Sequence, residues 1–122
     1  VEDARAAVDA AAKAFPVWSA MGPGERRALL MKASHALEAK GEAFAKAMAT
    51  ETGASGIWAG FNVHLAADML LEAAALTTQI NGQVIPSNVP GNVAMAVRQP
   101  AGVVLGIAPW NAPVILGVRA IA

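Results

Sequence analysis

The sequence predicts an α/β chain in which several helices are followed by a short β-hairpin and then by a strand, a turn and the start of a helix. Apolar residues recur at helical spacing from the N-terminus to about Ile80. After Asn81-Gly82 the pattern changes to short runs rich in valine and isoleucine, separated by Gly, Pro and Asn. A nearly continuous apolar run, Gly102–Ala108, then precedes the proline-bounded turn Pro109–Pro113. This order is typical of the first half of a βαβ unit.

Breakers and capping residues set the expected bounds of the helices. The first helix is expected from Glu2 to about Phe15, with Pro16 ending it, because proline removes a backbone N–H and clashes with the preceding turn. The next is expected over Pro23–Ala39, with Pro23 in its first turn. A short helix then follows Gly41 and ends at Gly53, which suits a left-handed position after a helix. A longer helix is expected from about Ser55 to Ile80.

The remaining segments predict extended structure and one further helix. Val84–Pro86 and Val93–Gln99 are expected to form short strands joined by a turn over Ser87–Asn92. Gly102–Ala108 fits a buried parallel strand. A helix is then expected from Val114 onward, with Pro113 in its first turn.

Composition limits the function classes. Hydrophobic residues make up 56% of the chain and charged residues 15%, which is too apolar for a disordered protein. The net charge is zero, and the evenly spread charges do not form a basic stripe, so we expect no nucleic-acid partner. The chain has no cysteine, which excludes a disulfide, a thiolate metal site and a cysteine nucleophile within these residues. We expect no bound metal.

The uncharged stretch Gln99–Val118 has the length of a membrane span, but its prolines and glycines interrupt it, so we expect no membrane contact. The N-terminus is acidic and alanine-rich and does not resemble a signal peptide, so we expect a cytoplasmic protein. The chain starts at Val1 directly before a helix and stops at Ala122 inside an apolar segment. These ends predict a fragment of a longer protein.

The turn between the last expected strand and helix is the best candidate for chemistry. Ligands bind at the carboxyl ends of parallel strands in α/β proteins. Asn111 lies there between two prolines, and a stiff loop could hold its amide as a fixed donor to an oxyanion. The alternative is that Asn111 only caps the following helix.

The amino-acid sequences of this segment and of several others resemble one protein family. Gly106–Pro113 looks like the Pro-Trp-Asn signature of the aldehyde dehydrogenase superfamily. Other segments are similar to landmarks of that family in the same order and at similar spacing: Phe15–Ser19, Gly24–Leu30, Glu51–Gly53, Gly82–Pro86 and Arg98–Val103. The resemblance covers essentially the whole chain.

The resemblance implies an architecture. Residues 1–81 would be the helical N-terminal part of the cofactor-binding domain, and residues 82–99 a hairpin arm used in oligomerisation. Residues 100–122 would be the first strand and the start of the first helix of a Rossmann-like domain. As a partner it implies further copies of the same chain, in a dimer or tetramer.

The resemblance also implies a reaction, in which a cysteine thiolate attacks an aldehyde, a hydride passes to NAD or NADP, and a glutamate activates water to release the acid. The matching positions make Asn111 the oxyanion donor and place the residues Ile107, Ala108, Pro109 and Trp110 beside the nicotinamide. The cysteine and the glutamate lie beyond Ala122 in the family pattern, so this chain alone is expected to be inactive. NAD is the favoured cofactor.

Within the family, Ala112 and the run Pro113–Ala120 look most like the aromatic-aldehyde branch, which includes salicylaldehyde and vanillin dehydrogenases. The resemblance makes Trp58, Leu116 and Arg119 candidate substrate residues. For Trp58 the alternative is a core tryptophan, and for Arg119 it is an ordinary surface cation.

Two other readings stay open from the sequence. The chain could be an independent helical interaction module whose apolar surplus binds a protein partner. It could also belong to a family relative that acts on acyl phosphates or semialdehydes. The coding sequence after Ala122 would discriminate the module from the enzyme, because further βα units and a cysteine-containing segment are expected only for the enzyme.

Overall fold

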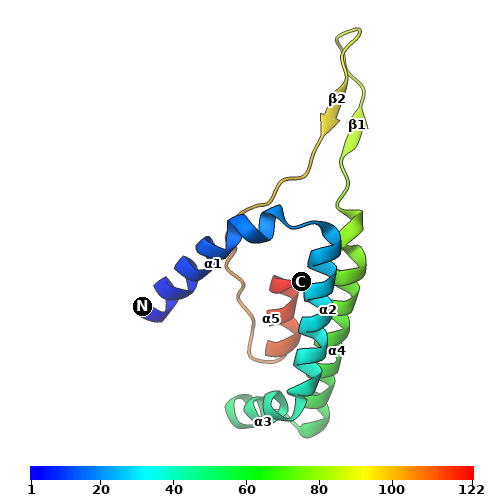
Figure 1. The fold of residues 1–122 in the computed structure, drawn as a ribbon. Helices are drawn as coiled ribbons and strands as arrows, with labels where there is room; N and C mark the ends of the chain where they lie inside the picture. Colours follow the sequence, from blue (N-terminus) through cyan, green and yellow to red (C-terminus); the bar gives the residue numbers. More distant parts are fainter.

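The computed structural model describes residues 1–122 and shows a helical layer from which a hairpin projects (Figure 1). In chain order the elements are α1 (Glu2–Ala20), α2 (Pro23–Ala39), α3 (Gly41–Thr52), α4 (Gly56–Leu76), the 3-10 helix η1 (Thr77–Gln79), β1 (Gln83–Ile85), β2 (Ala94–Ala96) and α5 (Pro113–Ile121). No helix is both long enough and apolar enough to span a membrane.

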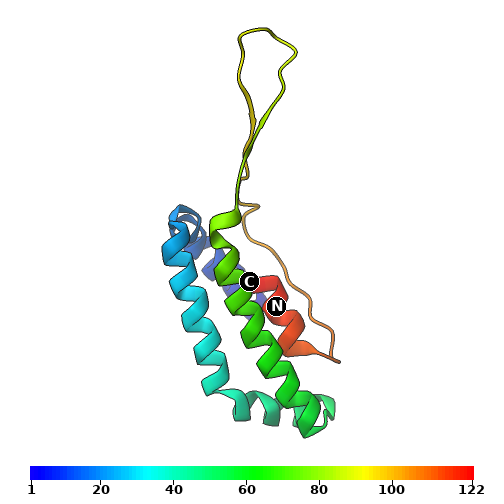
Figure 2. The ribbon, with the colours of Figure 1, turned by 90° about the vertical axis from the view of Figure 1, so that its right-hand side faces the viewer.

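Helix α4 is the element against which the others pack. It contacts α2, α3 and α5, and Figure 2 shows α2 and α4 running side by side. Small residues on its buried side, such as Ala59, Ala66 and Ala67, are fully buried and let the neighbouring helices approach closely. The core cluster comprises Leu37, Val63, Ala66, Ala67, Leu70 and Val118, which come from α2, α4 and α5. The last helix is therefore held by the same core as the second.

The caps explain why the middle helices begin and end where the sequence predicts. Helix α2 starts with Pro23, and the Gly22 N–H donates to Glu25 Oε2 at 3.2 Å. Helix α3 ends at Gly53, which adopts the left-handed φ of 70°. Helix α4 is capped by Ser55, whose Oγ accepts the Trp58 N–H at 3.3 Å. Its α-helical part ends at Leu76, and the predicted continuation toward Ile80 is a 3-10 turn.

The expectation that Pro16 ends the first helix was wrong, because α1 continues through it to Ala20. Proline prevents one backbone hydrogen bond and crowds the carbonyl of Ala12, but its fixed φ is itself helical. Ala12 is exposed, so its carbonyl can be solvated by water, and no residue of α1 is buried. The cost of the proline therefore falls on a part of the helix that the core does not constrain.

The hairpin is antiparallel, with Gln83 opposite Ala96 and Ile85 opposite Ala94. It extends beyond the end of α4 and away from the helices (Figures 1 and 2). The first strand has the predicted length but begins one residue earlier than Val84–Pro86, and the second is shorter than the predicted Val93–Gln99. Pro86 cannot donate a ladder hydrogen bond, and no third strand extends the pairing.

The buried strand expected over Gly102–Ala108 is not formed. The segment is extended but has no strand partner, and Leu105 and Ile107 are 82% and 84% exposed. A strand needs hydrogen-bonding neighbours, and none of the 122 residues supplies them here. The segment still lies close to the last helix. A Cβ added to Gly106 would clash with the Ala120 side chain.

Adjacent leucines on α4 give a matched test of this core. Leu70 is 4% exposed, and Leu71 is 38% exposed. We expect Leu70→Ala to lower the free energy of unfolding by about 2–5 kcal/mol, since it leaves a cavity in the core, and Leu71→Ala to lower it by less than about 1 kcal/mol. Urea unfolding followed by circular dichroism measures both, and equal losses would contradict the described core.

Candidate functional site

The turn before α5 holds Asn111 between Pro109 and Pro113. Trp110 and Asn111 form the turn, and α5 begins at Pro113. The carbonyl of Ala112 accepts the first helical hydrogen bond of α5, from the N–H of Leu116 at 3.0 Å. Trp110 is 75% exposed, and the Asn111 side chain is exposed as well. The turn thus presents both side chains outward from a backbone that is anchored to the last helix.

Asn111 does not cap this helix. The residue at the N-cap position is Ala112, and no side-chain cap bond is present. The main-chain carbonyl of Asn111 instead accepts a hydrogen bond from the indole Nε1 of Trp58 at 2.7 Å. The side-chain amide makes no hydrogen bond within the chain, so it is available to a ligand.

Trp58 lies in the first turn of α4 and is not a core residue, because 41% of its surface is exposed. Its ring stacks on Phe61 with centroids 5.5 Å apart and an interplanar angle of 23°. The stacking on Phe61 fixes the plane of the indole ring, and the hydrogen bond to Asn111 fixes the direction of its N–H. The structure therefore brings together Trp58 and Asn111, which are 53 residues apart in the sequence. No sequence spacing indicates this contact.

The other predicted site residues lie on either side of the turn. Ile107, Ala108 and Pro109 form an exposed strip that leads into it, and Trp110, which is also exposed, belongs to the turn itself. Leu116 is half-buried and Arg119 is exposed, one turn apart on α5. No hydrogen bond or ion pair joins Arg119 to Trp58 or Asn111. The structure thus groups Trp58 with Asn111 and leaves Arg119 two helical turns further along.

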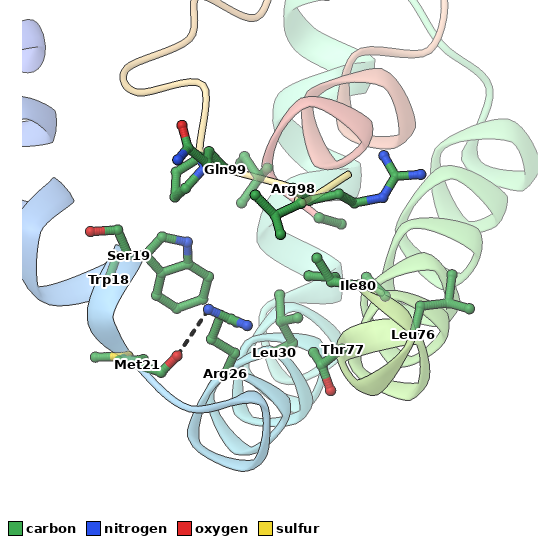
Figure 3. Close-up of a pocket in the computed structure, with 15 residues that line it drawn as sticks. Trp18, Ser19, Met21, Arg26, Leu30, Leu76, Thr77, Ile80, Arg98 and Gln99 are labelled. Atoms are coloured by element: carbon green, nitrogen blue, oxygen red, sulfur yellow. Dashed lines mark hydrogen bonds between the residues drawn. The ribbon is translucent and has the colours of Figure 1, made fainter. Parts of the chain in front are cut away.

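A separate pocket lies elsewhere in the structure. It measures about 1010 Å³ and is bounded by the end of α1, the start of α2, the end of α4 and the segment after β2 (Figure 3). Trp18, Arg26 and Arg98 line it, and the Arg26 guanidinium donates to the carbonyl of Met21 at 2.9 Å. It contains none of the predicted site residues, and sequence reasoning did not find it. We place the candidate chemistry at the Asn111 turn, because only there does a free amide donor sit on a backbone anchored from two sides.

Ionic interactions do not shape the site. His64 and Asp68 pair one turn apart on α4 at 3.6 Å, and both side chains are more than half exposed. Such a pair contributes little to stability. His64 accordingly lies on a solvated face, away from the Asn111 turn.

Comparison with known proteins identifies the family. The model of the aldehyde dehydrogenase family matches residues 1–122. A vanillin dehydrogenase from Pseudomonas sp. (strain HR199) is 69% identical over 122 residues, which are 100% of this chain and 25% of that protein. A salicylaldehyde dehydrogenase from Pseudomonas putida is 49% identical over the same share of each chain.

Solved structures show the same fold. The crystal structure of a salicylaldehyde dehydrogenase from Pseudomonas putida G7 complexed with salicylaldehyde superposes with a TM-score of 0.89 at 48% identity, over 98% of this chain and 25% of that one. A NAD-dependent benzaldehyde dehydrogenase from Corynebacterium glutamicum gives 0.90 at 34% identity, over 99% and 26%. This chain spans about a quarter of the length of these relatives. With the family model matched from end to end, the chain belongs to the aldehyde dehydrogenase family.

Proposed function

We propose that this chain is the N-terminal part of an NAD(P)-dependent dehydrogenase that oxidises an aromatic aldehyde to its carboxylic acid. The observation that carries the proposal is the free side-chain amide of Asn111 on an anchored turn. The identity to proteins named vanillin and salicylaldehyde dehydrogenases supports the aromatic substrate. The family match across the whole chain speaks against an independent interaction module.

In this proposal Asn111 stabilises the charge that develops on the aldehyde oxygen. When a thiolate adds to the carbonyl carbon, a C–S bond forms and the π electrons move to oxygen. An amide N–H that is already in place stabilises this oxyanion without having to reorganise during the reaction. The nucleophilic cysteine and the general-base glutamate belong to the part of the enzyme beyond this chain, which itself has no cysteine.

The strip leading into the turn fits the cofactor. Ile107, Ala108 and Pro109 before the turn and Trp110 within it are all exposed and apolar, as a surface against a flat nicotinamide ring requires. NAD or NADP, when bound, supplies the hydride acceptor. We favour NAD, as in the relative named benzaldehyde dehydrogenase [NAD(+)].

The substrate ring is proposed to lie near Trp58, Leu116 and Arg119. Trp58 offers a partly exposed aromatic face, and Leu116 adds a half-buried apolar side chain. The exposed guanidinium of Arg119 can donate to a ring hydroxyl or phenolate and stays charged at any working pH.

The hairpin, residues 82–99, is proposed to be an assembly arm of a homodimer or homotetramer. Val93, Met95 and Val97 alternate along β2 and the residues that flank it, and alternate residues of an extended chain share a face. They are 76%, 65% and 68% exposed. A two-stranded sheet with an uncovered apolar face needs another surface to stabilise it. In this proposal the residues before the hairpin, 1–81, are the helical section of the cofactor domain. The residues after it, 100–122, are the first strand and the start of the first helix of that domain. A cytoplasmic location stays a prediction from the sequence.

Replacing Asn111 by alanine in the full-length enzyme tests its role. We expect turnover to fall by about 10²–10³-fold, the usual effect of losing one oxyanion donor. Cofactor affinity should change little, because the main-chain anchor of the turn remains. Steady-state kinetics and a cofactor titration measure the two effects, and near-normal turnover would refute the assignment.

Arg119→Ala and Trp58→Ala test substrate selection. The ratio of kcat/KM for salicylaldehyde to that for a short aliphatic aldehyde should fall in both variants. We expect a change of about two- to tenfold, which corresponds to the loss of a contact worth about 0.5–1.5 kcal/mol. Lys13→Ala, on exposed α1, is the control. If the ratio stays constant in both site variants, these residues do not select the substrate.

Charges on the apolar face of the hairpin test the assembly arm. We expect the double variant Val93→Glu, Val97→Glu to lower the mass in solution, since burying two carboxylates at an interface is costly. Val17→Glu, on α1 at 63% exposure, is the matched control and should keep the native assembly. Analytical ultracentrifugation measures the mass of each variant in solution. An unchanged oligomer in the hairpin variant would overturn the assignment.

A further inference from the structure

We propose that Trp58 is a positioning residue, which holds the Asn111 turn in its active geometry through the indole N–H. This inference rests on the proposed role of Asn111. It differs from the proposed role of Trp58 as a wall for aromatic substrates, because it predicts a loss of turnover for every aldehyde.

The hydrogen bond is short and uniquely placed. Trp58 Nε1 lies 2.7 Å from the carbonyl oxygen of Asn111, at the short end of the range for N–H···O bonds. It is the only side-chain hydrogen bond made to the stretch from Pro109 to Pro113. Trp58 is thus the one side chain of the helices that forms a hydrogen bond with this turn.

Trp58 is itself held from three directions. Its backbone N–H donates to the capping Oγ of Ser55 at 3.3 Å, and its ring stacks on Phe61. Its own carbonyl accepts a hydrogen bond from Nδ2 of Asn62 at 3.1 Å, and Asn62 is fully buried. The indole edge therefore presents its N–H from the best-packed helix of the chain and not from a mobile surface position.

The turn needs this hydrogen bond, because its two prolines restrict only part of its backbone. Pro109 and Pro113 fix φ only at their own positions. Trp110, Asn111 and Ala112 keep both backbone dihedrals, and the first turn of α5 has no side-chain cap. A donor on the Asn111 carbonyl fixes the peptide plane that follows Asn111 and so limits the rotation of its Cα and amide. A small misplacement of a catalytic group can lower a rate strongly.

The test removes the N–H and keeps an aromatic ring. In the full-length enzyme we expect Trp58→Phe to lower kcat by about three- to tenfold, the effect of one ordinary hydrogen bond. The loss should be similar for benzaldehyde and for a short aliphatic aldehyde, with KM for the aliphatic aldehyde nearly unchanged. Trp18→Phe is the matched control: Trp18 is 40% exposed against 41% for Trp58, and its indole makes no hydrogen bond. Its kcat should equal that of the unmodified enzyme.

An isosteric side chain at position 58 distinguishes the loss of the hydrogen bond from misfolding. Benzothienylalanine at position 58 replaces the indole N–H by sulfur, keeps the bicyclic shape and should lower kcat as Trp58→Phe does. If Trp58 acts through Asn111, Trp58→Phe should cause no further loss of kcat in an Asn111→Ala background. Normal kcat with the isostere, or a loss confined to aromatic substrates, would overturn the inference alone. Normal turnover in Asn111→Ala would overturn the proposed function as well.

Discussion

Close packing along α4 is the constraint on which the rest of the structure depends. Its fully buried alanines bring α2 and α5 close enough to share one core cluster, which includes Leu37 of α2 and Val118 of α5. The Nε of Arg27 adds a hydrogen bond from α2 to the carbonyl of Ala74 at 3.1 Å. Because the first turn of α4 carries Trp58 and its middle holds α5, both supports of the Asn111 turn come from this helix. The site is positioned by the core although its own side chains are exposed.

Local chemistry made much of the fold predictable. Pro23, Gly53 and Pro113 act within one turn of chain, so the starts and ends of helices that depend on them follow from the sequence. The prediction failed where the outcome depends on distant partners or on solvent. Helix α1 tolerates Pro16 because none of its residues is buried, and the valine-rich run before Pro109 forms no strand because no neighbour pairs with it. Apolar content alone does not say whether a segment has a hydrogen-bonding partner.

For the candidate site, the sequence predicted a set of residues but not their arrangement. Asn111 and Trp58 were singled out through a resemblance to a family, and the family match across the chain confirms that resemblance. Their hydrogen bond joins a helix start to a turn 53 residues later, and no periodicity encodes such a contact. The pocket beside Trp18 and Arg98 was missed for the same reason, since its walls come from segments that are far apart in the sequence.

The route of the chain between η1 and α5 has a consequence for how the protein folds and varies. After Gln79 the chain leaves the helical layer, turns at the tip of the hairpin, contacts α4 again at Asn111 and forms α5 from Pro113. Docking α5 against α4 therefore closes one long loop, whose entropic cost grows only with the logarithm of its length. Doubling such a loop adds only about 0.6 kcal/mol. The hairpin could be lengthened or shortened at its tip with little effect on the docking of α5, so the reach of the arm and the geometry around Asn111 are free to vary independently.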